Sequence, residues 1–113
     1  MTELTKGHCE PCSKGAPKVT PEQSAELLRQ LPGWTIVERD GVERLERSFS
    51  FPDFAGALAF TVRVGQLAED EGHHPMLVTE WGRVQASWWT HKIGGLHQND
   101  FVMAAKTNEA YGG

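Results

Sequence analysis

Three histidines within nineteen positions are the residues of this 113-residue chain best suited to chemistry. His73 and His74 are adjacent, Glu69 precedes them, and Asp100 follows His91 by nine residues. Histidine gives and takes protons near neutral pH, because its unperturbed pKa is about 6.5. Carboxylates beside imidazoles hold the rings in one orientation and favour their charged form. The pattern therefore predicts a proton-transfer site.

Other chemistries fit the sequence less well. A zinc enzyme is the main rival, but the chain has neither a His-Glu-x-x-His motif nor a four-ligand Cys/His set. Ser87 and Thr90 stand near His91 without the Gly-x-Ser-x-Gly motif of a serine nucleophile. Gly94-Gly95 lacks the spacing of a phosphate-binding loop. Exposed loop histidines without a function are the plain alternative for the adjacent pair.

One tryptophan is a candidate for stacking on a flat substrate. The chain has four tryptophans, and in a small domain most such residues belong to the core or to an interface. We expect at most one of Trp34 and Trp81 to lie near a ligand, and we keep Trp34 as a substrate-binding candidate.

The composition is that of one ordinary globular domain, with 39% hydrophobic and 23% charged residues. The net charge of −4 argues against direct binding of nucleic acid, which normally requires a basic patch. No apolar run reaches the roughly 20 residues of a membrane helix, and no secretory segment opens the chain. We therefore expect a cytoplasmic protein whose two cysteines are reduced thiols.

We divide the chain into a flexible N-terminal tail over residues 1–18 and one folded domain over residues 19–113. The tail is polar, shows no hydrophobic period and contains a Cys-x-x-Cys motif, Cys9 to Cys12, beside His8. A tail without a function is the favoured interpretation, and a metal site shared between subunits is the alternative. The sequence leaves the role of the two cysteines open.

Two strand pairs alternate with three helices in the expected fold. Turn signals, Asp40-Gly41 foremost, separate the strands, which we place at residues 34–37, 43–51, 76–81 and 83–91. The helices begin at a capping box formed by Thr20 and Gln23, at Pro52-Asp53, and at about residue 98. This helix-hairpin-helix-hairpin-helix order predicts an α+β fold, with a four-stranded antiparallel sheet and three helices packed on one face.

The pattern of the long helix and of the last strand bears on the site. The inward stripe of the helix is expected on four residues at helical spacing, Phe54, Leu58, Val62 and Gly65. Glu69 continues that stripe, and a carboxylate on an inward face needs a partner to offset its lost hydration. In the last strand, His91 continues the face of Ser87 and Trp89, opposite Val84, Ala86 and Trp88.

The expected sheet has two edge strands, and exposed edges invite pairing with another copy. The half of the chain with Trp81, Trp88 and Trp89 is also rich in large apolar side chains. We therefore expect a homo-oligomer, either a homodimer or a homotetramer.

The histidine motifs resemble the signature of the pterin-4a-carbinolamine dehydratases. His73-His74-Pro75 and Thr90-His91 stand at the spacing of that family, with further matches at Glu69, Trp81, Gly95-Leu96 and Asp100. The segments Leu31-Pro32-Gly33-Trp34 and Phe49-x-Phe51 to Val62 also resemble it, so the similarity covers about residues 20–111.

The resemblance implies an oligomeric α+β enzyme, a hydro-lyase that dehydrates 4a-hydroxytetrahydrobiopterin to quinonoid dihydropterin. It implies no metal and no organic cofactor, and a role in recycling the pterin of an aromatic amino acid hydroxylase, which is then a candidate partner. It further implies that His73, His74 and His91 are catalytic, and that Glu69, Thr90 and Asp100 support the pterin. Which histidine is the acid and which the base stays open.

The same resemblance includes a different kind of function. Some members of the family act as non-catalytic dimerisation cofactors or assembly factors that bind a protein partner on the same fold. Here His73, His74 and His91 are all present, which favours the enzyme.

Two positions depart from the family pattern. Gly72 stands where many members have an acidic residue directly before the histidine pair. His97 stands where the last helix often begins with serine or threonine, and we expect it to be a helix cap or an added polar group near the site.

Overall fold

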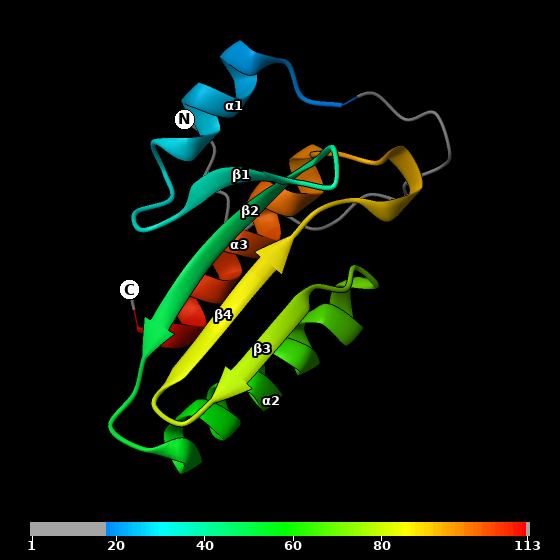
Figure 1. Ribbon diagram of the computed structural model, residues 1–113. Helices are drawn as coiled ribbons and strands as arrows, with labels where there is room; N and C mark the ends of the chain where they lie inside the picture. The colour runs from blue at the N-terminus through cyan, green and yellow to red at the C-terminus, as the bar shows by residue number, and fades with distance from the viewer. Residues whose placement is uncertain (1–17, 113) are drawn as a thin grey trace.

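A four-stranded antiparallel sheet organises residues 18–112, the part of the chain that the computed structural model describes. Its strands stand in the order β1-β2-β4-β3, with bounds β1 (Thr35–Arg39), β2 (Val42–Ser50), β3 (Met76–Glu80) and β4 (Arg83–Trp88). Helices α2 (Phe54–Glu71) and α3 (Gln98–Tyr111) pack together behind the sheet in Figure 1, and α1 (Pro21–Leu28) lies beyond β1. The predicted α+β fold is confirmed.

The predicted N-terminal tail falls almost wholly outside the described residues. Residues 1–17, which include Cys9 and Cys12, lie outside the description, as does Gly113. The flexibility of the tail and the role of its Cys-x-x-Cys motif therefore stay predictions. Among the described residues, no helix combines the length and the hydropathy that crossing a membrane requires.

The helix cap and the hairpin turn that the local sequence signals predict are both present in the structure. Thr20 Oγ1 accepts a hydrogen bond from the Gln23 N–H at 3.1 Å, and Gln23 Oε1 accepts one from the Thr20 N–H at 2.8 Å. Asp40 and Gly41 have φ angles of 53° and 79°, the left-handed pair that a two-residue hairpin of this type requires. Both signals act within a few residues, so no distant contact is needed to satisfy them.

The core lies between the sheet and the two long helices. Its sheet side is formed by the inward residues of β2 and β4, all at most 1% exposed: Leu45, Phe49, Val84, Ala86 and Trp88. The helix side includes Phe101, Ala104 and Ala105 of α3. The alternation predicted for β4 is therefore confirmed.

The predicted inward stripe of α2 is wrong. Phe54, Leu58 and Val62 are 45%, 49% and 60% exposed, whereas the buried face consists of Ala57, Phe60, Val64 and Ala68. The first half of α2 is apolar around most of its circumference, so spacing alone cannot select the face that meets the sheet. Glu69 consequently points to solvent, with 74% of its side chain exposed.

Candidate active site

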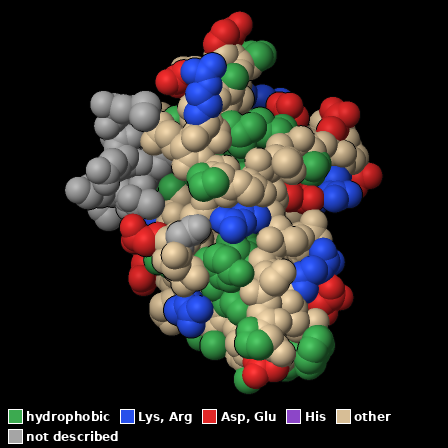
Figure 2. Space-filling model, turned by 90° about the vertical axis from the view of Figure 1, so that its left-hand side faces the viewer, with side chains coloured by type: hydrophobic (Ala, Val, Ile, Leu, Met, Phe, Trp, Pro, Cys, Tyr) green, Lys and Arg blue, Asp and Glu red, His purple; other side chains and the backbone are tan. Residues whose placement is uncertain are grey.

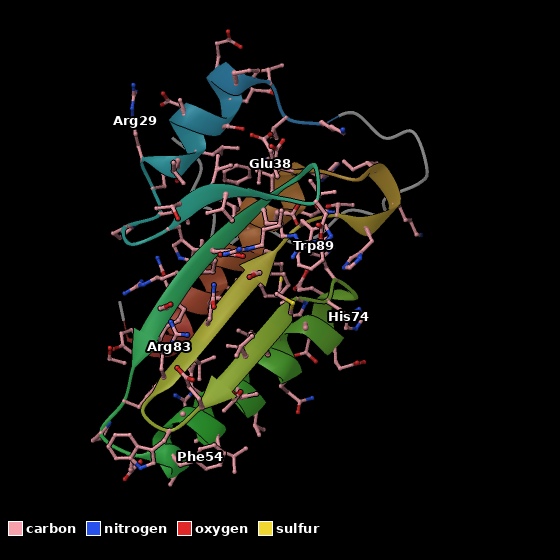
Figure 3. All side chains as sticks on the ribbon, in the orientation of Figure 1. Arg29, Glu38, Phe54, His74, Arg83 and Trp89 are labelled. Carbon is pink, nitrogen blue, oxygen red and sulfur yellow. The ribbon has the colours of Figure 1, made fainter. Side chains whose placement is uncertain are left out.

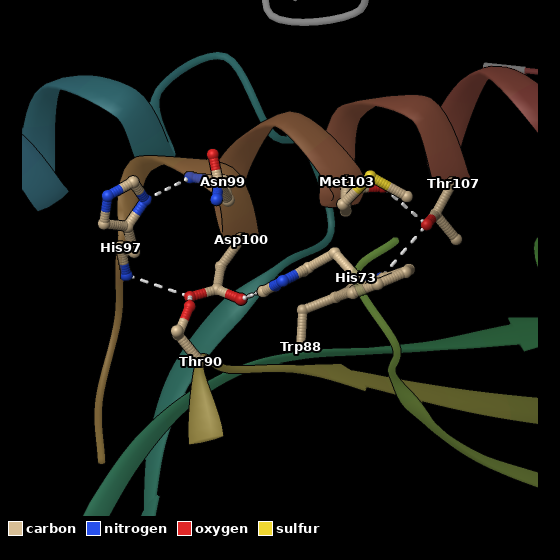
Figure 4. Close-up of polar contacts among 8 residues, drawn as sticks. All are labelled: His73, Trp88, Thr90, His97, Asn99, Asp100, Met103 and Thr107. Carbon is tan, nitrogen blue, oxygen red and sulfur yellow. Dashed lines mark hydrogen bonds and ion pairs between the residues drawn. The ribbon is translucent and has the colours of Figure 1, made fainter. Parts of the chain in front are cut away.

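Asp100 is a fully buried carboxylate at the start of α3 that accepts three hydrogen bonds (Figure 4). Its Oδ1 lies 2.6 Å from Nε2 of His73, and its Oδ2 accepts from Thr90 Oγ1 at 2.8 Å and from the His97 N–H at 2.9 Å. A carboxylate with no exposed surface needs such donors to offset its lost hydration. The N-terminal turn of α3 adds a favourable field.

His73 is fixed from two sides. Besides its bond to Asp100, its ring stacks parallel to Trp88, with 5.8 Å between the ring centroids and 7° between the planes. Trp88 is itself held by a hydrogen bond from Nε1 to Thr107 Oγ1 at 3.1 Å. Because an ionised carboxylate can only accept, Nε2 of His73 carries the shared hydrogen, and Nδ1 is the ring nitrogen left to exchange a proton with a substrate.

His74 points the other way and lies at the surface. Its Nε2 is 3.3 Å from Glu69 Oε1, and 60% of its side chain is exposed. The two histidines diverge because α2 ends at Glu71 and Gly72 follows in a left-handed conformation, with φ of 64°. Glycine adopts this conformation without strain, which gives the Gly72 departure a conformational role.

His91 lies in a turn, and the prediction that the last strand runs to this residue is wrong. β4 ends at Trp88, and Thr90 then pairs with Gly95 through two backbone hydrogen bonds of 2.8 and 3.4 Å. The short 3-10 helix His91–Ile93 fills this loop, and Gly94 closes it with φ of 61°. The His91 ring rests on Trp89, with 4.5 Å between the centroids.

These groups lie at one end of the molecule. Figure 3 shows His74 and Trp89 at the end where α2 and β4 finish, opposite Phe54 and Arg83. No described histidine is visible on the face drawn in Figure 2. The contacts join His73 and Thr90 through Asp100, and the chain leads from Thr90 directly to His91.

Trp34 lies in the core and not among these residues. It is 4% exposed, its Nε1 donates to Asn108 Oδ1 at 2.6 Å, and its ring meets Phe49 edge-on at 6.0 Å. A ring this buried offers almost no surface for stacking on a substrate, so we leave Trp34 out of the proposed site.

The sequence reasoning assigned no site role to Trp88, and left His97 with two alternatives. Alternation had placed Trp88 on one face with Val84 and Ala86 but gave no sign that it would stack on His73. His97 is the N-cap of α3: its Nδ1 accepts from the Asn99 N–H at 3.0 Å while its own N–H bonds Asp100. The three-residue spacing from His97 to Asp100 is that of a capping box, and this spacing is the sequence signal that predicts His97 as the N-cap.

Proton transfer is the chemistry that this arrangement suits. A buried carboxylate fixes one imidazole, a second imidazole is exposed beside a carboxylate, and a third lies on the adjoining loop. Within residues 18–112, no three histidine, cysteine, aspartate or glutamate side chains gather so as to hold a metal ion.

Comparisons with known proteins point to one family. The family model described as "Pterin 4 alpha carbinolamine dehydratase" matches residues 17–110. Two curated relatives, from Chlorobium luteolum and Microcystis aeruginosa, are 55% and 50% identical to this chain, and both carry the name "Putative pterin-4-alpha-carbinolamine dehydratase". Each alignment covers 98% of this chain, and 97% and 96% of the respective relatives.

Two solved structures share the fold. A protein from Brucella melitensis described as a transcriptional coactivator/pterin dehydratase superposes with a TM-score of 0.78 at 36% identity, over 85% of this chain and all of its own. A pterin dehydratase-like protein described as a RuBisCO assembly factor in the alpha-carboxysome gives a TM-score of 0.60 over 71% of this chain and 90% of its own. Its identity is 21%, so this second likeness concerns the fold alone.

Proposed function

The chain belongs to the pterin-4a-carbinolamine dehydratase family, and on this premise we propose that it dehydrates 4a-hydroxytetrahydrobiopterin to quinonoid dihydropterin by histidine acid/base catalysis. Recycling the pterin of an aromatic amino acid hydroxylase, in the cytoplasm, is part of the proposal. The observation that carries it is the His73–Asp100–Thr90 cluster, which fixes one imidazole beside the loop of another.

The reaction needs two proton transfers and no electron transfer. The hydroxyl on C4a leaves as water after it receives a proton, and the neighbouring N5–H gives up its proton as the C=N double bond forms. Each well-placed acid or base typically contributes about 10²–10⁴-fold to the rate. Imidazoles can fill both roles, one protonated and one neutral.

The three histidines suit these transfers in different ways. His73, held by Asp100 and Trp88, presents Nδ1 in one orientation, which lowers the cost of reaching the reactive geometry. His74 is exposed and can exchange its proton with water between turnovers. His91 begins the 3-10 helix in the loop whose ends, Thr90 and Gly95, are hydrogen-bonded to each other. We propose that His73, His74 and His91 are catalytic and that Glu69, Thr90 and Asp100 support them.

A coupled assay tests this function. Purified protein is added to a phenylalanine hydroxylase reaction that generates the 4a-carbinolamine, and the decay of the carbinolamine absorbance is compared with the uncatalysed rate. Acceleration supports the proposal. A folded protein that gives no acceleration contradicts it and favours the second candidate, a non-catalytic assembly role through a protein partner.

We also propose that the protein is a homo-oligomer. β3 is an edge strand with exposed Met76 and Val78, and the adjacent α2 exposes Phe54, Leu58 and Val62. Figure 2 shows hydrophobic side chains gathered at the lower end of the molecule, where Figure 1 places the start of α2. Exposed apolar stripes beside an unpaired edge support association with a second copy.

Leu58→Asp is expected to dissociate this oligomer. Burying a leucine side chain contributes about 1.5–3 kcal/mol, and in a symmetric interface the change occurs twice, so the dissociation constant should rise roughly 100-fold or more. Light scattering coupled to size-exclusion chromatography measures the mass. Ala25→Asp, at an exposed position of α1, is the control and should leave the mass unchanged. A monomeric wild-type protein would contradict the proposal.

A further inference from the structure

An arginine, a tryptophan and a histidine are packed together where β4 ends. The register that pairs Leu45 with Trp88 brings Arg44 beside Trp89. Arg44 Cζ lies 4.0 Å from the centroid of the Trp89 ring, and the His91 ring lies 4.5 Å from the same ring, tilted by 39°. The proposed reaction assigns no role to Arg44 or Trp89, so their contact with His91 needs its own explanation.

The side chain of His91 lies against the Trp89 ring. The backbone of the loop is fixed by the Thr90–Gly95 hydrogen bonds, but the imidazole of His91 is exposed. An exposed side chain samples several rotamers, and holding it in one of them costs conformational entropy. The half-buried Trp89 ring offers a rigid surface that restricts those rotamers before any substrate arrives.

Trp89 is in turn covered by Arg44. A guanidinium over an indole ring is the strongest common cation–π pair, and it also packs as a flat plate on the ring. The Nε of Arg44 is buried without a hydrogen-bond partner among the described residues. The guanidinium stacks on Trp89 instead.

Arg39 on the neighbouring strand binds a carboxylate, whereas Arg44 stacks on a ring. Arg39 binds Glu46 through two hydrogen bonds of 2.8 Å, and these bonds hold the pKa of Glu46 below its usual range. Glu46 also accepts from Gln85 and Ser87, at 3.0 Å each. Four donors thus occupy this carboxylate, and Arg44 is directed to the aromatic ring.

We propose that Trp89 is a positioning residue for His91 and that Arg44 holds Trp89 in place for this purpose. The inference rests on the proposed function, because it assumes that His91 acts on the pterin. Neither residue touches the reacting atoms in this account; both act through the imidazole that they orient.

The kinetic test compares variants that remove or keep the stacking. Trp89→Leu should lower kcat about tenfold, less than the about 10²–10⁴-fold expected for loss of an acid or base, with little change in KM. Trp89→Phe keeps an aromatic surface and should recover most of the rate. Arg44→Met keeps the aliphatic stem over the ring and removes only the cation–π contact, so it should lower kcat about threefold. Arg83→Met, which removes an exposed arginine paired with Glu80, is the control and should leave kcat unchanged.

A nuclear magnetic resonance measurement separates positioning from a general structural effect. The Hδ2 and Hε1 resonances of His91 should carry ring-current shifts from Trp89, which Trp89→Leu abolishes and Trp89→Phe largely retains. Circular dichroism checks that each variant is folded. An inactive wild-type protein would overturn the proposed function. With an active wild type, a Trp89→Leu variant with unchanged kcat, or with lowered kcat but unmoved His91 resonances, would overturn the inference.

Discussion

Replacing Asp100 with asparagine should lower kcat for dehydration about 100-fold, because misplacing a reacting group by about 1 Å costs that much. The ionised carboxylate accepts all three hydrogen bonds that reach it, from His73, Thr90 and His97. An asparagine offers one oxygen and one NH2 group, so in either orientation at least one donor faces another donor. In the orientation that keeps the oxygen on Thr90 and His97, the NH2 group faces Nε2 of His73, and this ring loses the acceptor that fixes its tautomer.

The same substitution should also destabilise the fold. One buried donor left without an acceptor costs about 1–3 kcal/mol, and each kcal/mol lowers the Tm of a domain of this size by about 4–8 °C. The coupled assay gives kcat, and thermal unfolding followed by circular dichroism gives Tm. The kcat is measured at a temperature at which the variant is folded, and the unfolding scan starts from the folded variant.

Thr90→Val is the matched control for Asp100→Asn. Valine has nearly the size of threonine but lacks its hydroxyl donor, and the hydrogen bond that His73 donates to Asp100 stays in place. We expect a loss of about 0.5–1.5 kcal/mol in stability and a much smaller loss of kcat. If the two variants lost kcat equally, the carboxylate would act through the Thr90 loop and not through His73, and the role given to Asp100 would be wrong.

Local signals in the sequence predicted local structure well. The Thr20–Gln23 capping box and the Asp40-Gly41 turn each depend on residues at most three positions apart, and both formed as expected. The face of α2 was predicted wrongly because Phe54, Leu58 and Val62 form one apolar stripe and a second stripe runs beside it. Only packing against the sheet decides between them, and no local pattern encodes that choice.

The candidate site divides in the same way. The motif resemblance placed His73 and Asp100 in one site, and the structure joins them, although 27 residues separate them in the chain. That Trp88 would stack on His73 depends on how β4 packs against the segment after α2, and that Trp34 would bond Asn108 depends on how α3 packs against the segment before β1. The end of β4 was predicted wrongly because Ser87, Trp89 and His91 continue the alternation of a strand. Gly94 and Gly95 allow a tight turn there, and the alternating pattern does not show where that turn begins.

His74→Ala should separate catalysis from stability. We expect kcat to fall by about 10²–10⁴-fold, the usual contribution of one acid or base. The Tm should stay within about 1–2 °C of wild type, because exposed pairs such as His74 with Glu69 contribute little. The coupled assay and thermal unfolding measure the two quantities on the same preparation.

His73→Ala and Glu69→Gln are the two variants with which His74→Ala is compared. His73 is 11% exposed and lies between Trp88 and Asp100, so its removal should lower both kcat and Tm. Glu69→Gln keeps the shape of the partner and removes its charge, and should lower kcat less than His74→Ala does. A folded His74→Ala variant with wild-type kcat would remove His74 from the mechanism. The two proton transfers would then fall to His73, whose orientation Asp100 sets, and to His91, whose orientation we assign to Trp89.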